Sequence, residues 1–322
     1  MKLKQLIALF ALLSLLCSLC ACVAQPAEPT AATQPAQTTP VTTAATEPTE
    51  EAKPYGLTPL VENGRYVYNP HLLSQESIDY MGEGFAPFFA SFVDAFLNYE
   101  PQCYCPDSSY AEMLSTIIYY DFPLYTALAE PFEYFRHYNP ETGMATITYR
   151  YDRPTHDAIK AQLIQAANNF LAATAPENSD IQNARAIYHA LSGSITYDHS
   201  ALEIFERKES YYAYLYGTGV CITFANAYNQ MLTQVGIQAT LASCDVPNDV
   251  GHIWSLVTLD GQQYFCDPTY EISYDEGQGY RFFGMTYAQR TADGLGQLGI
   301  YGGRYLSYLM TEDMLSPQPL AP

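Results

Sequence analysis

Residues 251–270 read GHIWSLVTLDGQQYFCDPTY, and their pattern decides how this part of the chain folds. Two runs of alternating hydropathy flank the dipeptide Asp260–Gly261, which is a strong signal for a two-residue β-hairpin loop of type I′. In such a loop Leu259 pairs with Gln262, and every other cross-strand pair follows from that one. The sequence therefore predicts two antiparallel strands with a fixed register.

This register brings three chemically distinctive side chains together. Because side chains alternate between the two faces of a strand, His252, Trp254 and Asp267 share one face of the hairpin. Trp254 lies opposite Asp267, and His252 lies diagonal to it, at ~7–8 Å between Cα atoms. Each residue alone has a purely structural interpretation. The shared face favours a histidine that is oriented by an aspartate.

Upstream of the hairpin, residues 216–232 read YGTGVCITFANAYNQML. Cys221 stands between a glycine-rich turn and a predicted amphipathic helix, so its thiol falls in the first helical turn. The unpaired N–H groups and the helix dipole there favour a thiolate. Cys is also a common core residue, so the position alone does not establish a nucleophile. The expected buried face of the helix consists of Phe224, Ala225, Tyr228, Met231, Leu232 and Val235.

Taken together, the segments GVCITFANAYNQMLTQVGIQA, GHIWSLVTLDG and YFCDPTY resemble the three core motifs of the transglutaminase-like superfamily. The resemblance covers roughly residues 178–270 and implies a papain-like α+β fold, in which the nucleophile helix packs on an antiparallel sheet. It also implies that Cys221 is the nucleophile, His252 the general base and acid, and Asp267 the carboxylate that orients the imidazole.

Departures from the family pattern concern the pocket around these residues. Ile253 stands where Ala is usual, and Tyr270 follows Asp-Pro-Thr where Trp is frequent. An oxyanion hole would use the N–H of Cys221 and one further donor. In the superfamily that donor is often a side chain upstream of the nucleophile, so Tyr212 is a candidate. Trp254 is a candidate for the wall of the pocket.

The first residues of the chain have the pattern of a secretion signal. Lys2 and Lys4 precede the apolar run LIALFALLSLLCSL, which is too short for a comfortable membrane span. The following LCAC resembles a bacterial lipobox, which implies removal of the signal peptide and lipidation of Cys22. An ordinary signal peptide cut near Ala24 is the competing interpretation. With the lipobox, we expect the protein on the extracytoplasmic face of the cell membrane, held by a lipid anchor.

The remaining chain divides by composition. Residues 1–21 are the predicted signal peptide. Residues 22–55 are rich in Pro, Thr, Ala and Glu with almost nothing to bury, so we expect a disordered tether. Residues 56–154 are predicted to form an N-terminal accessory region. Their pattern indicates helices and a hairpin, and it contains no catalytic motif. Residues 155–312 are predicted to form the transglutaminase-like domain.

Several local signals predict individual elements. Residues 84–99 have apolar side chains at helical spacing, and residues 132–151 alternate in hydropathy around a turn. Ser179 and Gln182 fit a capping box that opens a helix. Residues 276–299 predict a loop and a strand at the edge of the domain.

Charge and cysteine usage exclude several classes of protein. A net charge of −20 at pH 7 argues against a nucleic-acid binder, which needs basic patches. Cys103 and Cys105 lack a second pair at ligand spacing, so we expect neither a zinc site nor any other metal or cofactor. The cysteines after the signal region are odd in number and irregularly spaced, unlike a disulfide framework: Cys103, Cys105, Cys221, Cys244 and Cys266.

Three functions are compatible with this sequence. The first is an extracytoplasmic enzyme that hydrolyses peptide or amide bonds of a peptide or protein substrate through a Cys221 thioester. The second is a protein-crosslinking transglutaminase that passes the same acyl group to an amine. The third is a non-enzymatic surface-binding lipoprotein. A complete Cys-His-Asp set favours the two enzymes, since a pure binding module has no need of it.

Overall fold

The computed structural model describes residues 58–82, 84–111, 114, 122–129, 138–244, 251–292, 298–300 and 315–320. These residues belong to one compact unit, Glu51–Pro322. The predicted signal peptide, Cys22 and all of the predicted tether lie outside the described residues. No helix among the described residues has both the length and the hydrophobicity needed to cross a bilayer.

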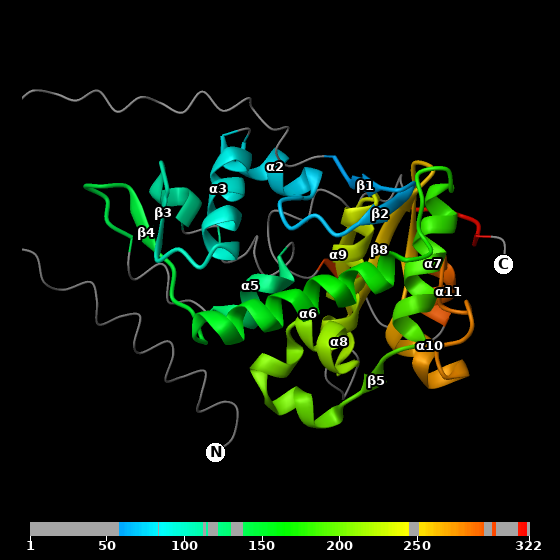
Figure 1. Cartoon of the computed structure of the whole chain (residues 1–322). Coiled ribbons are helices and arrows are strands. Elements are labelled where there is room, and N and C mark those ends of the chain that lie inside the picture. The colour runs from blue at the N-terminus through cyan, green and yellow to red at the C-terminus, as the bar shows by residue number, and fades with distance from the viewer. Residues whose placement is uncertain are drawn as a thin grey trace, which may run out of the picture. The chain divides into compact units, whose positions relative to one another are not determined.

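A four-stranded antiparallel sheet forms the centre of the C-terminal part of the chain (Figure 1). Its strands follow the order β10-β7-β8-β9, so the predicted hairpin of β8 and β9 occupies one edge. The outer edge of β9 is covered in part, because Phe265 and Gln263 form isolated bridges with Met285 and Leu315. The strands are β7 (Ala239–Cys244), β8 (His252–Leu259), β9 (Gln262–Cys266) and β10 (Leu298–Ile300).

Helix α9 (Cys221–Gln234) packs against β7 and β8 and begins at Cys221, as predicted. The prediction of an amphipathic helix, with one side facing solvent, is wrong, because almost every residue of α9 is buried. Two of its polar residues bond to other elements. Gln230 accepts a hydrogen bond from the hydroxyl of Tyr214, and Gln234 accepts one from the backbone N–H of Asn69. The helix is therefore a central element rather than a surface one.

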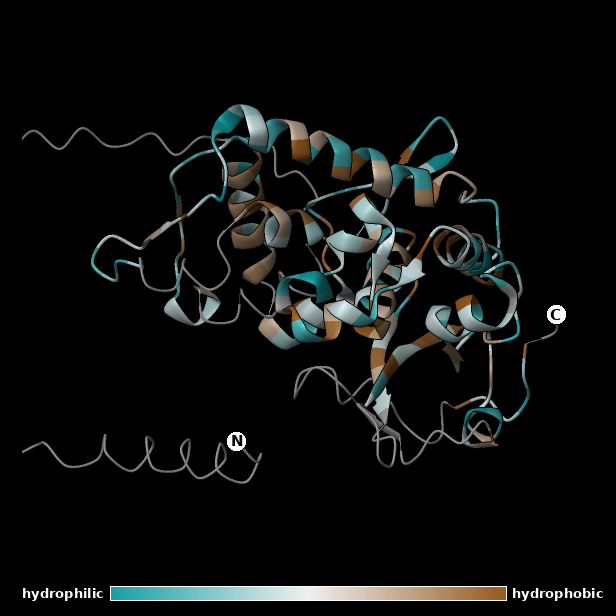
Figure 2. Cartoon of the chain, turned by 90° about the horizontal axis from the view of Figure 1, so that it is seen from below, coloured by the Kyte–Doolittle hydropathy of each residue, from teal (hydrophilic) through white to brown (hydrophobic). Residues whose placement is uncertain are grey.

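Helices α6, α7 and α8 cover α9. Asp152 caps α6, and the predicted capping box of Ser179 and Gln182 is present at the start of α7. Figure 2 shows hydrophobic and hydrophilic residues alternating along the long helix α6, as one buried face requires. The elements are α6 (Arg153–Leu171), α7 (Asp180–Ser192), β5 (Thr196–Tyr197), η2 (His199–Glu203), η3 (Phe205–Lys208), α8 (Tyr211–Tyr216) and β6 (Thr218–Gly219).

The N-terminal region has short strands and helices, including the helix predicted over residues 84–99. A hairpin was predicted over residues 132–151, and its first residues, 132–137, lie outside the described residues. Its second strand, β4, makes one bridge with Asn139 and pairs along its length with β3. The elements are β1 (Leu60–Glu62), β2 (Arg65–Val67), α2 (Gln75–Met81), α3 (Phe85–Leu97), β3 (Gln102–Tyr104), α5 (Pro123–Leu128) and β4 (Met144–Thr146).

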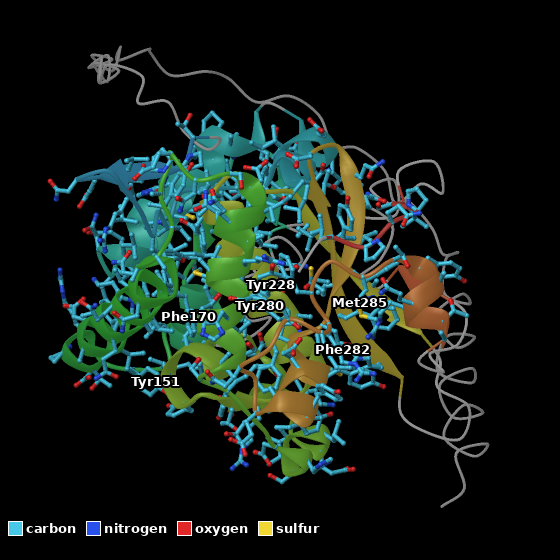
Figure 3. All side chains as sticks on the ribbon, turned by 90° about the vertical axis from the view of Figure 1, so that its right-hand side faces the viewer. Tyr151, Phe170, Tyr228, Tyr280, Phe282 and Met285 are labelled. Atoms are coloured by element: carbon cyan, nitrogen blue, oxygen red, sulfur yellow. The ribbon has the colours of Figure 1, made fainter. Side chains whose placement is uncertain are left out.

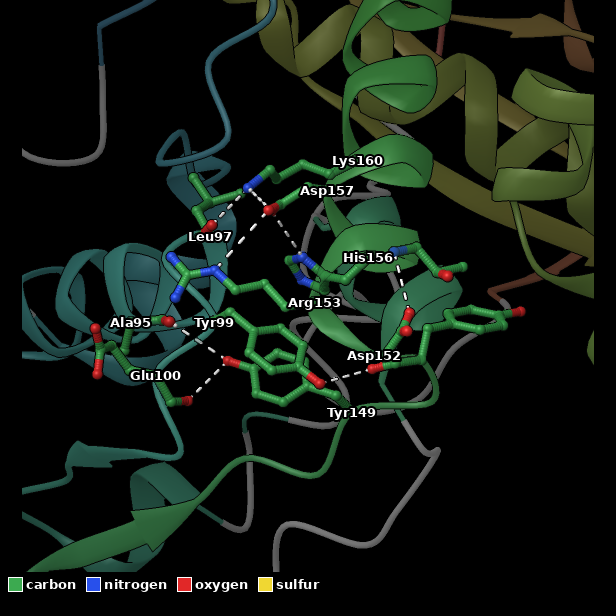
Figure 4. A network of polar contacts seen from close by, with 12 residues as sticks. Ala95, Leu97, Tyr99, Glu100, Tyr149, Asp152, Arg153, His156, Asp157 and Lys160 are labelled. Carbon is green, nitrogen blue, oxygen red and sulfur yellow. Dashed lines mark hydrogen bonds and ion pairs between the residues drawn. The ribbon is translucent and has the colours of Figure 1, made fainter.

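This N-terminal region and the sheet share one hydrophobic cluster, whose buried members run from Tyr68 to Phe283. Polar contacts join it to α6 (Figure 4). Lys160 of α6 donates to the carbonyl of Leu97 in α3 at 2.6 Å. Within the N-terminal region, the hydroxyl of Tyr149 donates to the carbonyl of Glu100 at 2.8 Å. His156 of α6 is fully buried against three aromatic rings of this region. The accessory region therefore contributes to one continuous core.

The segment after the hairpin differs from its prediction. The expected strand exists as β10, which pairs with β7. The structure adds two helices that were not expected, α10 (Pro268–Asp275) and α11 (Tyr287–Ala292). Between them, Phe282 and Met285 pack in one cluster with Trp254 beside the sheet (Figure 3). This segment covers the face of the hairpin that carries the candidate residues.

Candidate active site

Cys221 occupies the first position of α9 and is 7% exposed. The N–H groups of a first helical turn have no acceptor within the helix, so they can face an anion. Two hydrogen bonds of Thr223 fix this helix end. Its hydroxyl accepts from the N–H of Val220 at 3.2 Å and donates to the carbonyl of Lys208 at 3.0 Å. The sulfur is therefore carried by a rigid part of the fold.

The turn before Cys221 allows a close approach that only glycine permits. A Cβ at Gly219 would lie 2.5–2.7 Å from the side-chain atoms of Thr223. Real Cβ contacts are longer than this, so any larger residue would displace Thr223. Gly219 also pairs with Tyr197 in the short parallel ladder of β5 and β6. The glycine thus sets how the chain enters α9.

Replacing Gly219 with alanine should therefore disturb the nucleophile. We expect a loss of about 1–3 kcal/mol in the free energy of unfolding from overpacking, and a fall of about tenfold or more in the rate at which Cys221 is alkylated. Gly261→Ala is the control, because Gly261 also has a positive φ but a Cβ added to it would meet no other atom within 4 Å. Equal alkylation rates in the two variants would contradict this role of Gly219.

The hairpin has the predicted register and turn. Leu259 pairs with Gln262 and Ser255 with Cys266. Asp260 and Gly261 have φ values of 51° and 76°. Both lie in the left-handed region, as a type I′ turn requires, so the prediction is confirmed.

His252 and Asp267 meet as the register predicts. The Nε2 atom of His252 donates to the Oδ2 atom of Asp267 at 2.7 Å. Asp267 is fully buried and caps α10, where its Oδ1 atom accepts from the N–H of Tyr270 at 3.1 Å. Pro268 follows as the first helical residue, which explains the Asp-Pro pair physically. The carboxylate is held at a helix start.

Cys221 reaches the same imidazole. The Cys221 thiol lies close enough to the imidazole to help raise the pKa of His252. Because Nε2 is bonded to Asp267, Nδ1 is the nitrogen that remains for the sulfur. Thiol, imidazole and carboxylate thus form one chain of contacts from three separate elements, α9, β8 and the start of α10.

Residues 166–268 match the family model of the transglutaminase-like superfamily. Residues 166–268 thus form a transglutaminase-like domain. The matched range contains Cys221, His252 and Asp267 and ends one residue after the last of them. No curated protein matches the chain.

Solved structures resemble this domain at low sequence identity. "Crystal structure of a TGase" has 12% identity and a TM-score of 0.32, over 44% of each chain. A "Putative Cysteine Protease from Cytophaga hutchinsonii" has 14% identity and a TM-score of 0.30, over 44% of this chain and 42% of that one. A "putative protease from Parabacteroides distasonis" has 12% identity and a TM-score of 0.27, over 39% and 29%. The chain spans less than half of each structure.

Two aromatic rings line the imidazole of the transglutaminase-like domain. The ring of His252 stacks on Tyr270, with centroids 4.7 Å apart and planes 10° apart. It also stacks on Trp254, at 5.5 Å and 27°. Trp254 is 2% exposed. The tyrosine that departs from the family pattern therefore still provides an aromatic wall.

A second cation, which the sequence did not reveal, binds the same carboxylate. The Nη2 atom of Arg290, in α11, donates to Oδ2 of Asp267 at 2.7 Å. The guanidinium lies over the rings of Trp254 and Tyr270, at 4.7 and 5.1 Å from their centroids. Arg290 is 2% exposed. Asp267 thus joins two buried cationic side chains through one oxygen.

The sequence did hold a signal for the helix that carries this arginine. Thr286 and Gln289 form reciprocal hydrogen bonds, at 2.9 Å from the N–H of Thr286 and 3.2 Å from the N–H of Gln289. The stretch TYAQ is a capping-box pattern that predicts a helix start. It gave no signal that Arg290 contacts Asp267.

These contacts determine the charges at neutral pH. Burial acts to lower the pKa of His252, but the charge of Asp267, the hydrogen bond to it and the nearby Cys221 outweigh burial and raise this pKa to about 9. Burial acts to raise the pKa of Asp267, but the neighbouring His252 and Arg290 cations hold it below its usual value. The pair is therefore an imidazolium and a carboxylate over the physiological range.

A buried carboxylate supports α10 from behind. Glu271 accepts from the hydroxyl of Tyr188 at 2.9 Å and from the N–H of Phe282 at 2.8 Å. The same hydroxyl donates to the backbone carbonyl of Asp267 at 3.0 Å. These bonds join α7, α10 and the segment before α11. They fix the backbone that positions the catalytic carboxylate candidate.

Other predicted residues lie elsewhere. The ring of Tyr212 contacts Tyr211 and Tyr216. Within the part of the chain that the structure describes, no hydrogen bond or ring contact joins Tyr212 to Cys221, so its oxyanion role stays a prediction. Cys266 points to the opposite face of the hairpin, as expected, and burial raises its pKa to about 12. Among the described side chains, no group of three or more His, Cys, Asp and Glu could hold a metal ion.

Proposed function

We propose that the protein is a thiol acyl-transfer enzyme that hydrolyses peptide or amide bonds through a thioester at Cys221. The observation that carries this proposal is the continuous set of contacts from Cys221 through His252 to Asp267. These residues offer a thiol nucleophile, a proton carrier and an orienting carboxylate within one buried cluster.

The first half-reaction forms the thioester. The Cys221 thiolate attacks the carbonyl carbon of the substrate, and the backbone N–H of Cys221 faces the oxyanion that develops. The C–N bond then breaks while the His252 imidazolium gives its proton to the leaving amine. Asp267 keeps the imidazole oriented and stabilises its cation throughout.

The second half-reaction releases the acyl group. Neutral His252 takes a proton from water, whose oxygen attacks the thioester carbon. The C–S bond breaks, the acid product leaves and the imidazolium–thiolate pair is restored. If a primary amine replaces water, the same steps give a new amide bond, which is the crosslinking alternative.

For the location, we retain the proposal of an extracytoplasmic lipoprotein. It is supported by the LCAC motif after the apolar run and by the Pro- and Thr-rich stretch that follows. Metabolic labelling with an alkyne-bearing fatty acid, compared between the native chain and Cys22→Ala, tests lipidation. Equal labelling of the two proteins would contradict it.

Selective alkylation tests the thiol chemistry directly. At pH 7 we expect iodoacetamide to modify Cys221 at least about 100-fold faster than Cys266, because burial keeps the latter thiol protonated. Peptide mass spectrometry measures both rates in the same sample. In His252→Ala the rate at Cys221 should fall. Uniformly slow labelling of all mature cysteines would favour the binding lipoprotein instead.

A second measurement separates the two enzymes. A glutamine-containing peptide is incubated with the protein, with and without a fluorescent primary amine. Release of the free acid in both samples supports hydrolysis, and incorporation of the amine supports crosslinking. Cys221→Ala should abolish either product.

A further inference from the structure

We propose that Arg290 is a positioning residue that sets the charge balance of the Cys221–His252 pair by neutralising Asp267. This inference rests on the proposed function, since it concerns the same site. It adds a fourth charged group to the three that the family pattern identifies.

The geometry makes Asp267 the polar anchor of Arg290. Both Nη2 of Arg290 and Nε2 of His252 lie 2.7 Å from the same atom, Oδ2. The two nitrogens are therefore no more than twice that distance apart. The rest of the guanidinium contacts apolar surface, with Trp254 and Tyr270 beneath it and Nη1 3.9 Å from the sulfur of Met285.

The surroundings leave little water to screen these charges. Arg290 and Asp267 are 2% and 0% exposed, and His252 is 8% exposed. In such a site, a unit charge within about 4–6 Å shifts a titration by roughly 1–3 pH units. Arg290 is therefore close enough to His252 to change how tightly the imidazole holds its proton.

The charge count shows what Arg290 does. With Arg290, the four groups are neutral in total, both as thiolate with imidazolium and as thiol with neutral imidazole. Without it, both forms carry one uncompensated negative charge from Asp267. That charge would hold the proton on His252 more tightly and disfavour the Cys221 thiolate. Because Arg290 compensates the charge of Asp267, the positive charge of the His252 imidazolium compensates that of the Cys221 thiolate.

Other titratable groups near the pair do not replace this cation. Glu271 of α10 is buried and bonds to Tyr188 and to the backbone of Phe282. Tyr270 contacts the imidazole through its ring and the carboxylate through its N–H. Cys266 lies on the opposite face. None of these groups adds positive charge at Asp267.

The test is the pH dependence of iodoacetamide alkylation at Cys221. The variants are Arg290→Gln, which keeps a hydrogen-bond donor without charge, Arg290→Met, which keeps neither, and Arg290→Lys, which keeps the charge. In the two neutral variants, the pH of half-maximal alkylation should rise by about one unit. In Arg290→Lys it should stay within a few tenths of a unit of the native value.

Arg185→Met is the matched control. Its guanidinium lies over Tyr280 and Phe283, at 5.1 and 5.6 Å from the ring centroids. Loss of this arginine–aromatic contact should leave the midpoint unchanged. The fluorescence of Trp254, the one tryptophan of the sequence, reports whether each variant is folded.

The outcomes distinguish this inference from the proposed function. If native Cys221 shows no preferential alkylation, the proposed function fails. If native Cys221 is reactive but folded Arg290→Gln or Arg290→Met keeps the native midpoint, the role of Arg290 is overturned. A midpoint raised equally in Arg290→Lys would also overturn it, because geometry rather than charge would then be responsible. If neither neutral variant folds, a raised midpoint in folded Arg290→Lys still overturns the proposed role of the charge.

Discussion

Replacing Asp267 with asparagine should lower the steady-state turnover of a generic acyl donor, such as 4-nitrophenyl acetate, by about 10³-fold. An amide cannot stabilise the His252 imidazolium, and its NH₂ group can bond to the imidazole in the wrong tautomer. Turnover is followed by absorbance at constant pH, with Cys221→Ala as the background. Turnover within tenfold of the native rate would show that Asp267 does not orient the base.

The same substitution should also destabilise the domain, because it leaves Arg290 buried without its anion. Breaking one partner of a buried pair costs about 3–5 kcal/mol. The double variant Asp267→Asn with Arg290→Met should recover much of this free energy of unfolding and none of the turnover. Chemical denaturation measures the first quantity. Recovery of turnover in the double variant would mean that the single variant failed through misfolding alone.

The free energy of unfolding should fall by about 3 kcal/mol between pH 6.5 and pH 9 because of His252. Its pKa is raised to about 9 in the folded protein, so the folded state binds this proton more tightly than the unfolded chain does. That stabilisation is complete below the unfolded pKa, near 6.5, and is lost as the pH rises through 9. Urea denaturation at closely spaced pH values measures the change.

His252→Phe is the control for this pH dependence. Phenylalanine keeps an aromatic ring against Tyr270 and Trp254 but does not titrate. Burial raises the pKa of Cys103 and Cys266 to about 12, so these thiols also lower stability above about pH 8.5 in both proteins. The difference between the two curves therefore isolates His252. Parallel curves would show that the imidazole gains no protonated partner on folding.

The hairpin shows how far local sequence reaches. The Asp260–Gly261 turn fixed the pairing of β8 with β9, because only one register satisfies a two-residue loop. That register correctly brought His252 to Asp267. Cys221 was likewise placed at a helix start by its neighbours. All these features depend on residues close together in the chain.

The prediction for α9 failed where distant residues meet. The polar side of α9 looked solvent-exposed, yet residues such as Gln234 bond to the N-terminal region, 165 positions away. The segment 276–299 looked like a loop and a strand, although the capping box at Thr286 was readable. Hydropathy describes what a side chain can bury, and it does not identify the partner that covers it.

The sequence by itself thus determined the turn, the register, the helix that starts at Cys221 and the identity of the three candidate groups, because short-range sterics and period-two alternation decide each of them. Only the tertiary structure decided that α9 is buried on all sides and that Arg290 binds Asp267 over two aromatic rings. Those contacts form between elements far apart in the chain. Their free energy depends on shape and desolvation in the folded state, which no local pattern encodes.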